Sequence, residues 1–172
     1  MGVQRIRGRA LPEGGGDRPR AAGAVNLAQL NLGRLRHPID APQSREFAAA
    51  VDRINALADR APGFVWRSRT NGHGNDPLII LNISVWRSYA HLHAYVYRTA
   101  HHHYVRRRDQ WFTRIQTPAT ALWWVPSDHE PTVDEALARL SHLRRFGPTP
   151  QAFTVRTRFD PEGRPEGVRT GR

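Results

Sequence analysis

The chain has 172 residues, of which 39% are hydrophobic and 24% charged, as expected for one folded domain. It has no Cys and its basic residues are all Arg, which excludes disulfides, thiolate metal sites and lysine Schiff-base chemistry. No apolar run approaches the roughly 18 residues of a membrane span, so we expect a cytoplasmic protein with no membrane partner. The net charge of +11 is spread along the chain rather than gathered beside aromatic residues, so we expect no nucleic-acid partner.

Both ends of the chain differ in composition from its middle. Residues 1–23 and 157–172 are rich in Gly, Pro and Arg and show no hydrophobic periodicity. Such segments bury too little apolar surface to offset the entropy of ordering the chain. The sequence therefore predicts two disordered tails and one folded domain over residues 24–156.

The hydrophobic pattern between the tails predicts strands and helices in a regular order. A turn-rich segment, 71–76, joins the second and third strands as a hairpin, and Glu135 lies at capping-box spacing from Thr132. In chain order we expect strands at 24–32, 64–69, 77–86 and 119–125, and helices at 42–60, 89–115 and 131–146.

This β-α-β-β-α-β order with one extra helix predicts a ferredoxin-like α+β fold, an antiparallel four-stranded sheet with helices on one face. The second sheet face must also be covered. We expect a second copy of the chain to cover it, which makes the protein a homodimer.

Alternation along the predicted strands indicates a face with polar groups. On the strand 77–86 one face is wholly apolar, and the other carries Asn82, Ser84 and Trp86. Gln29 and Asn31 share a face of the first strand. Two more pairs share a face each on the second and fourth strands: Phe64 with Trp66, and Leu122 with Trp124. An apolar wall with a few polar groups is typical of a ligand pocket, although cross-strand hydrogen bonds between the amides and Trp-filled core would give the same pattern.

The predicted long helix supplies candidate chemistry opposite this face. Tyr97 and His101 are four residues apart and so share one side of a helix, with Arg108 further along. An inward His beside a Tyr is a candidate acid, base or ligand, and a buried His bonded to a carbonyl or to the Tyr hydroxyl is the alternative. The remaining His residues lack the helical spacing of a metal site, so we expect no metal.

Several segments together resemble a known bacterial family, the domain of unknown function 3291, over about residues 26–153. They are LAQLNLGRLRHPID, FAAAVDRINALADRAPGFVWR, LNISVWRS, YVYRTAH, RRRDQWF, LWWVPSDHEPTVDEALARLSHLRRFGPTP and AF. That family is similar to the dimeric α+β barrel superfamily, which includes antibiotic-biosynthesis monooxygenases and haem-degrading monooxygenases. The resemblance implies a homodimer with a pocket between sheet and helices in each subunit.

The first functional hypothesis is a monooxygenase-like enzyme that needs no bound cofactor. It would act on a hydrophobic or aromatic molecule, such as a secondary metabolite, by acid–base or oxygenase-type chemistry. Its candidate catalytic residues are His101, Tyr97, Asn82 and Arg108. Its candidate substrate-binding residues are Asn31, Trp66, Ser84, Trp86, Trp111 and Trp124.

Two alternatives remain open. The resemblance to the haem-degrading branch implies a haem held by His101 or His93, with Asn31 and Trp86 around it. The other alternative is a dimer that binds a ligand without catalysing a reaction. A closed, fully packed centre would indicate the latter.

Overall fold

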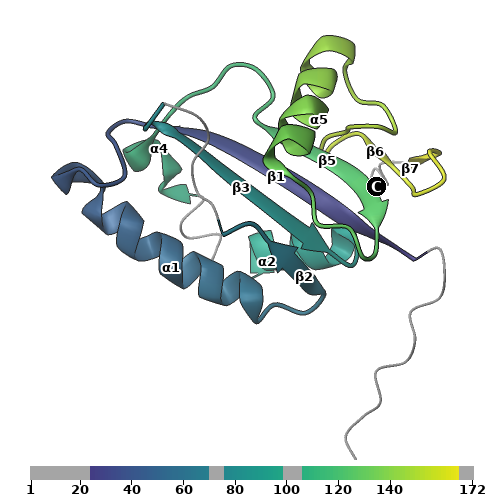
Figure 1. Cartoon of the computed structure of the whole chain (residues 1–172), viewed down its shortest axis with the longest axis horizontal. Helices are drawn as coiled ribbons and strands as arrows, with labels where there is room; N and C mark the ends of the chain where they lie inside the picture. Colours follow the sequence, from purple (N-terminus) through teal and green to yellow (C-terminus); the bar gives the residue numbers. More distant parts are fainter. Residues whose placement is uncertain (1–23, 70–75, 99–105, 167–172) are drawn as a thin grey trace, which may run out of the picture.

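The structure, a computed structural model, describes residues 24–69, 76–98 and 106–166 (Figure 1). Its main sheet is built around the long strand β1 (Val25–Leu35). One edge of β1 pairs with β3 (Ile79–Trp86), which pairs in turn with β2 (Phe64–Arg67). The other edge pairs with β5 (Thr120–Pro126) and the short β4 (Phe112–Thr113). All these pairs are antiparallel, and the predicted ferredoxin-like α+β fold is confirmed.

The helix α5 (Val133–Phe146) covers one face of the sheet, in front of it in Figure 1. Its Ala136, Leu140 and Leu143 are buried in one cluster with Ile83 and Trp123 of the strands. The predicted helix start is confirmed, because the Thr132 side chain accepts a hydrogen bond from the backbone N–H of Glu135. This helix covers the face for which we expected a second copy of the chain. The uncovered face therefore no longer supports the homodimer, which stays a prediction.

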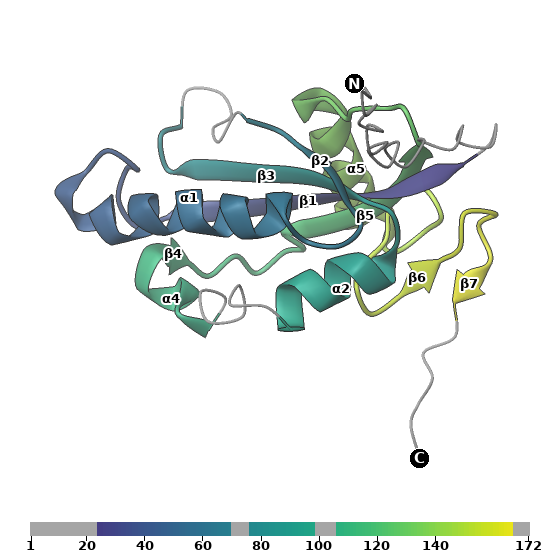
Figure 2. The same cartoon turned by 90° about the horizontal axis from the view of Figure 1, so that it is seen from below.

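The opposite face packs against α1 (Arg45–Asp59), which follows a 3₁₀ turn η1 (Pro42–Ser44), and against α2 (Tyr89–Arg98). Figure 2 shows α2 on the side of the sheet opposite to α5. Two separate apolar clusters form on this face. One gathers around Trp86 and Leu92, and the other around Leu35, Phe47 and Trp111. The middle of the face, between the two clusters, is where the polar side chains of β1 and β3 lie.

The single long helix expected at 89–115 is wrong at its C-terminal end, where the described chain is a strand from Phe112. After α2 the described chain resumes in a short helix α4 (Arg108–Trp111) and then turns into β4, where Phe112 pairs with Leu35. The Phe112 ring lies edge-on to Phe47 at 5.0 Å and directly over Gly33, so strand pairing and ring packing outweigh local helix propensity. Among the described residues, no helix combines the length and apolar character of a membrane span.

The folded part extends past residue 156, where we expected a tail to begin. A hairpin of β6 (Arg158–Phe159) and β7 (Pro165–Glu166) follows it. The Trp124 indole Nε1 donates to the backbone oxygen of Phe159 at 2.8 Å, and the Phe159 ring packs into the cluster around Trp86. This tertiary contact orders a segment with no hydrophobic periodicity. The tail predicted at 1–23 lies outside the described residues.

Candidate functional site

The polar groups of β1 and β3 lie side by side on one face, as the alternation predicted. In the strand register Gln29 is opposite Ser84, and Asn31 is opposite Asn82. The Ser84 hydroxyl donates to Gln29 Oε1 at 3.3 Å and accepts from the Trp86 indole Nε1 at 3.0 Å. These bonds tie one end of the row into the buried core. We call Gln29, Asn31, Asn82 and Ser84 the amide row.

The other end of the amide row is open. Asn31 and Asn82 are both exposed, although they occupy the middle of their strands. The Thr120 hydroxyl donates to Asn31 Oδ1, and within the described ranges the Asn82 amide has no hydrogen-bond partner. Amides in this position have N–H groups available to a bound oxygen atom.

Helices α1 and α2 form the facing wall of a small cavity. The cavity is lined from the sheet side by the amide row, Trp86 and Arg67, and from the helices by Asn55, Ala58, Tyr95 and Val96. Its volume is about 30 Å³, and a water molecule needs at least about 10–15 Å³ measured in this way. The enclosed part therefore admits one small polar group.

Tyr95 of α2 lines the helix side of the cavity, beside Trp86. Their rings stack with centroids 4.9 Å apart and an interplanar angle of 27°, and the Tyr95 hydroxyl donates to the backbone oxygen of Ile54 at 3.1 Å. Burial raises the pKa of Tyr95 well above its ordinary value, so the phenol stays protonated at neutral pH. The single O–H of Tyr95 is therefore held by Ile54, and Tyr95 cannot act as a base.

A bulge in β2 determines which of its side chains face the cavity. Phe64 pairs with Trp86 and Trp66 with Val85, so Val65 is an extra residue and Arg67 comes to pair with Ser84. Val65 and Trp66 both pack in the cluster under α5, whereas Phe64 packs on the cavity face. The expectation that Trp66 shares a face with Phe64 is therefore wrong, and Trp66 lies outside the cavity lining.

The structure separates the other expected site residues. Tyr97 is 56% exposed and contacts His93 on the outer side of α2, so its predicted inward orientation is wrong. Arg108 is exposed on α4, away from the cavity lining. Trp111 and Trp124 belong to the two apolar clusters rather than to the lining. His101 lies outside the described residues.

The described part of the cavity does not fit a haem. Pockets for ligands of drug size enclose about 300–1,000 Å³, far more than the volume found here. His93 is exposed, and Trp86 is almost completely buried, with 1% of its surface exposed. Asn31 alone of the described haem candidates is an exposed lining residue. Within the described ranges, no three His, Asp or Glu side chains gather as metal ligands would.

Sequence reasoning missed Tyr95, Asn55 and Arg67 as lining residues. Tyr95 lies three residues after buried Leu92, on the same helix side, and that spacing was the available signal. Arg67 reaches the cavity only because of the bulge, which regular alternation along β2 does not indicate.

Comparison with known proteins identifies the family. Residues 26–169 match the model of the family described as Domain of unknown function (DUF3291), and no curated protein matches the chain. Among solved structures, SnoaB, a cofactor-independent oxygenase from Streptomyces nogalater, is similar with a TM-score of 0.46 and 16% identity, over 65% of this chain and 100% of that one. The NE2512 protein of unknown function from Nitrosomonas europaea is similar with a TM-score of 0.44 and 11% identity, over 64% of this chain and 97% of that one. The family match covers almost the whole folded part, so this chain belongs to the DUF3291 family, as its sequence segments predicted.

Proposed function

We propose that this protein is an enzyme that binds a small organic molecule through a carbonyl, enol or phenol oxygen and stabilises the anion of that oxygen. The observation that supports the proposal is the exposed pair Asn31 and Asn82, directly opposite each other on β1 and β3. Apolar clusters lie on both sides of this pair on the same sheet face. Exposed amides there add little to folding, and they are suited to binding a polar group.

The chemistry of the lining favours negative charge on the ligand. The side-chain amides of the row can donate to an oxygen atom. Of the described residues that line the cavity, none is acidic and one, Arg67, is a cation. Fixed donors aimed at an oxygen that becomes negative are the basis of oxyanion stabilisation.

The size of the cavity suggests how the substrate sits. The enclosed part takes one polar group, while the exposed ends of Asn31 and Asn82 leave the rest of the molecule over the sheet between the two apolar clusters. A flat, hydrophobic or aromatic molecule with one acidic hydroxyl matches these surroundings.

His101 is our candidate for the base. It would take the proton from the substrate O–H or C–H group and leave a phenolate or enolate at the amide row. Returning the proton to another atom gives isomerisation. Transfer of electrons from the same anion to molecular oxygen, as the second reactant, begins an oxygenase reaction.

A coloured phenol tests the proposal. Absorbance distinguishes 4-nitrophenol from its phenolate, so the pKa of the bound probe can be measured by titration in excess protein. We expect binding to lower the probe's pKa by about one unit, a tenfold preference for the anion. Asn82→Leu, which keeps the side-chain size and removes the amide, should abolish that shift.

The matched control is Gln43→Leu, which removes an exposed amide from η1, outside the cavity lining. It should leave the shift unchanged. A probe whose pKa is unchanged or raised on binding, or is lowered equally in Asn82→Leu, contradicts the proposal.

A further inference from the structure

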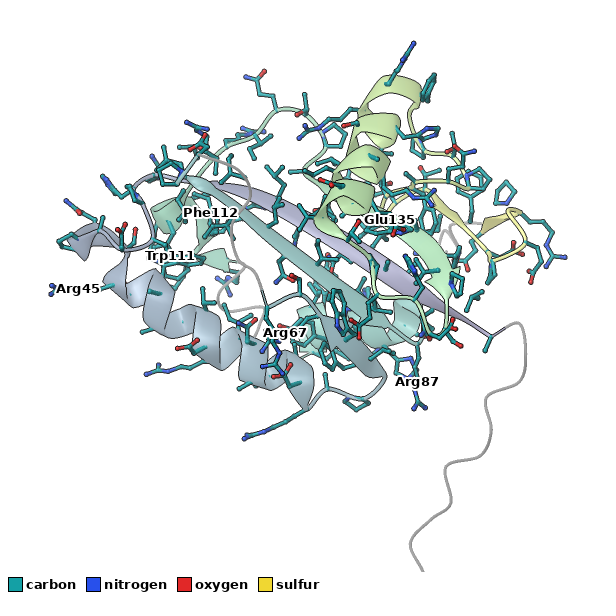
Figure 3. The ribbon with its side chains drawn as sticks, viewed as in Figure 1. Arg45, Arg67, Arg87, Trp111, Phe112 and Glu135 are labelled. Atoms are coloured by element: carbon teal, nitrogen blue, oxygen red, sulfur yellow. The ribbon has the colours of Figure 1, made fainter. Side chains whose placement is uncertain are left out.

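Arg67 is held in a fixed orientation by the last residue of α1. Its Nε donates to Asp59 Oδ1 at 2.8 Å and its Nη2 to Asp59 Oδ2 at 3.2 Å. Figure 3 shows Arg67 beside the C-terminal part of α1. Two parallel hydrogen bonds fix the plane of the guanidinium, which a single contact does not. Only 20% of the Arg67 side chain is exposed, against 45% for Asp59.

The pair is oriented with its positive member toward the cavity. Arg67 lines the cavity and Asp59 does not, so the guanidinium is the member that a ligand would meet. Among the described residues Nη1 of Arg67 has no hydrogen-bond partner. One nitrogen therefore keeps its two N–H groups for a ligand while the other two hold the side chain in place.

Electrostatics keep this arrangement intact at neutral pH. The hydrogen bonds from Arg67 hold the pKa of Asp59 below its ordinary value, so the carboxylate stays ionised and paired. The charges on Arg67 and Asp59 also act on the Tyr95 hydroxyl, in opposite directions, and burial of that hydroxyl is the larger effect on its pKa. The Arg67–Asp59 ion pair and the Tyr95 hydroxyl therefore interact electrostatically.

The bulge in β2 points to a role for Arg67 beyond pairing with α1. If β2 alternated regularly through Val65 with no bulge, residue 66 would face the cavity and Arg67 would face away from it. Bulges commonly redirect a side chain beside a functional site, at the expense of regular strand pairing. Here the redirected side chain is the cation of the cavity lining.

We infer that Arg67, positioned by Asp59, binds a carboxylate of the substrate, so that the substrate is an organic acid that also carries the phenol or enol oxygen. The inference rests on the proposed function, because Arg67 and the amide row line the same cavity. Arg67 pairs with Ser84, and Asn82 lies two residues further along β3 on the same face, so the Cα atoms of Ser84 and Asn82 are about 7 Å apart. The two oxygen-bearing groups of the substrate should have a similar separation, as at opposite ends of a benzene ring.

Two probes of nearly equal shape test this inference. The first, 4-hydroxybenzoate, has a carboxylate opposite its phenol, and the second, 4-hydroxybenzamide, replaces that carboxylate with a neutral amide. Calorimetric titration of the full chain should show at least about tenfold tighter binding of the benzoate, the usual order for one charge-assisted hydrogen-bonded pair.

Variants of the ion pair identify the origin of that preference. Arg67→Gln should lose the tenfold preference while its affinity for 4-hydroxybenzamide stays within about twofold of the wild type. Arg67→Lys, which keeps the charge but not the planar fork, should retain part of the preference. This conservative variant keeps the test usable if Arg67→Gln does not fold. Asp59→Asn should reduce the preference by releasing the guanidinium. Arg87→Gln, at an exposed arginine outside the cavity lining, is the matched control and should change nothing.

The outcomes separate this inference from the proposed function. Equal binding of both probes by the wild type, or a preference that survives Arg67→Gln, overturns the carboxylate assignment. If Asn82→Leu still weakens both probes in that case, the proposed function stands. If the wild type binds neither probe, both the inference and the proposed function fail.

Discussion

Asn31 and Asn82 are direct partners across the antiparallel β1–β3 ladder, and both side chains are exposed at the middle of a face that is apolar at either end. The Asn82 side-chain amide makes no hydrogen bond to any residue that the structure describes. The side chains of a pair in this position contribute little to the stability of the fold. Its residue types are those that would bind an oxygen atom of a ligand.

The first prediction separates stability from binding at this pair. Because the Asn82 amide bonds to no described residue, Asn82→Leu should change the free energy of unfolding by no more than about 0.5 kcal/mol. The same change should weaken 4-hydroxybenzoate binding at least about tenfold, since a hydrogen-bonded partner is lost. Urea unfolding and calorimetric titration measure the two effects. A loss of several kcal/mol in stability would mean that Asn82 serves the fold.

The second prediction concerns the tight turn before β2. Gly63 has φ +76°, and a Cβ there would lie 2.2 Å from the His91 ring. Gly63→Ala should therefore add a steric penalty of about 1–3 kcal/mol to the backbone strain of a positive φ. Gly147→Ala is the control, because Gly147 has φ +72° but nothing within 4 Å of the added atom. Equal losses of unfolding free energy in the two variants would contradict the predicted clash.

The third prediction concerns the buried indole of Trp123. Its Nε1 donates to Glu135 Oε1 at 2.9 Å, and only 1% of Trp123 is exposed. Glu135→Ala leaves this N–H without its acceptor and should cost about 1–3 kcal/mol of unfolding free energy. Glu135→Gln keeps an acceptor oxygen and should cost less. Chemical denaturation of both variants tests the difference, and equal costs would assign the loss to another feature of Glu135.

The fourth prediction is a pH dependence of stability at Asp59. Its pKa is lowered in the folded protein from an ordinary value of 3.8, chiefly by the hydrogen bonds from Arg67. The folded state thus binds this proton less readily than the unfolded state does. The stabilisation is fully present above pH 3.8 and is lost as the pH falls through the lower folded pKa.

Comparing urea midpoints of the wild type and Asp59→Asn between pH 2 and 7 checks this sign. The difference in stability should be constant near neutrality and shrink as the solution becomes more acidic. A difference that grows on acidification would contradict the assignment. Because the pair is partly exposed, added salt should reduce the effect.

The predicted polar face was confirmed because β1 and β3 are long and regular, so strict alternation holds from Gln29 to Asn31 and from Asn82 to Ser84. The interpretation failed in β2, where one extra residue, Val65, exchanges the orientations expected for Trp66 and Arg67. A bulge depends on pairing with β3, a long-range interaction that the local residue pattern does not indicate.

The predictions for the helix at 89–115 were wrong for a related reason. The helix phase was inferred from a pairing of Tyr97 with His101, whereas the described helix buries Leu92 and Tyr95 and turns Tyr97 to solvent. Phe112 likewise leaves the helix because Phe47 and Gly33 accommodate its ring on the sheet. Tertiary packing determines which side of α2 is buried and where the helix ends, and it outweighs helix propensities of a few tenths of a kcal/mol per residue.

The side-chain amide resonances of Asn31 and Asn82 provide the most direct test of the ligand site. They can be assigned in ¹⁵N-labelled protein from the signals lost in Asn31→Leu and Asn82→Leu, and followed during titration with 4-hydroxybenzoate. We predict that these two NH₂ groups undergo the largest side-chain shifts, while the Trp66 and Trp123 indole signals under α5 stay unchanged. Unmoved Asn31 and Asn82 amides, with shifts concentrated in the indoles of the opposite face, would contradict it.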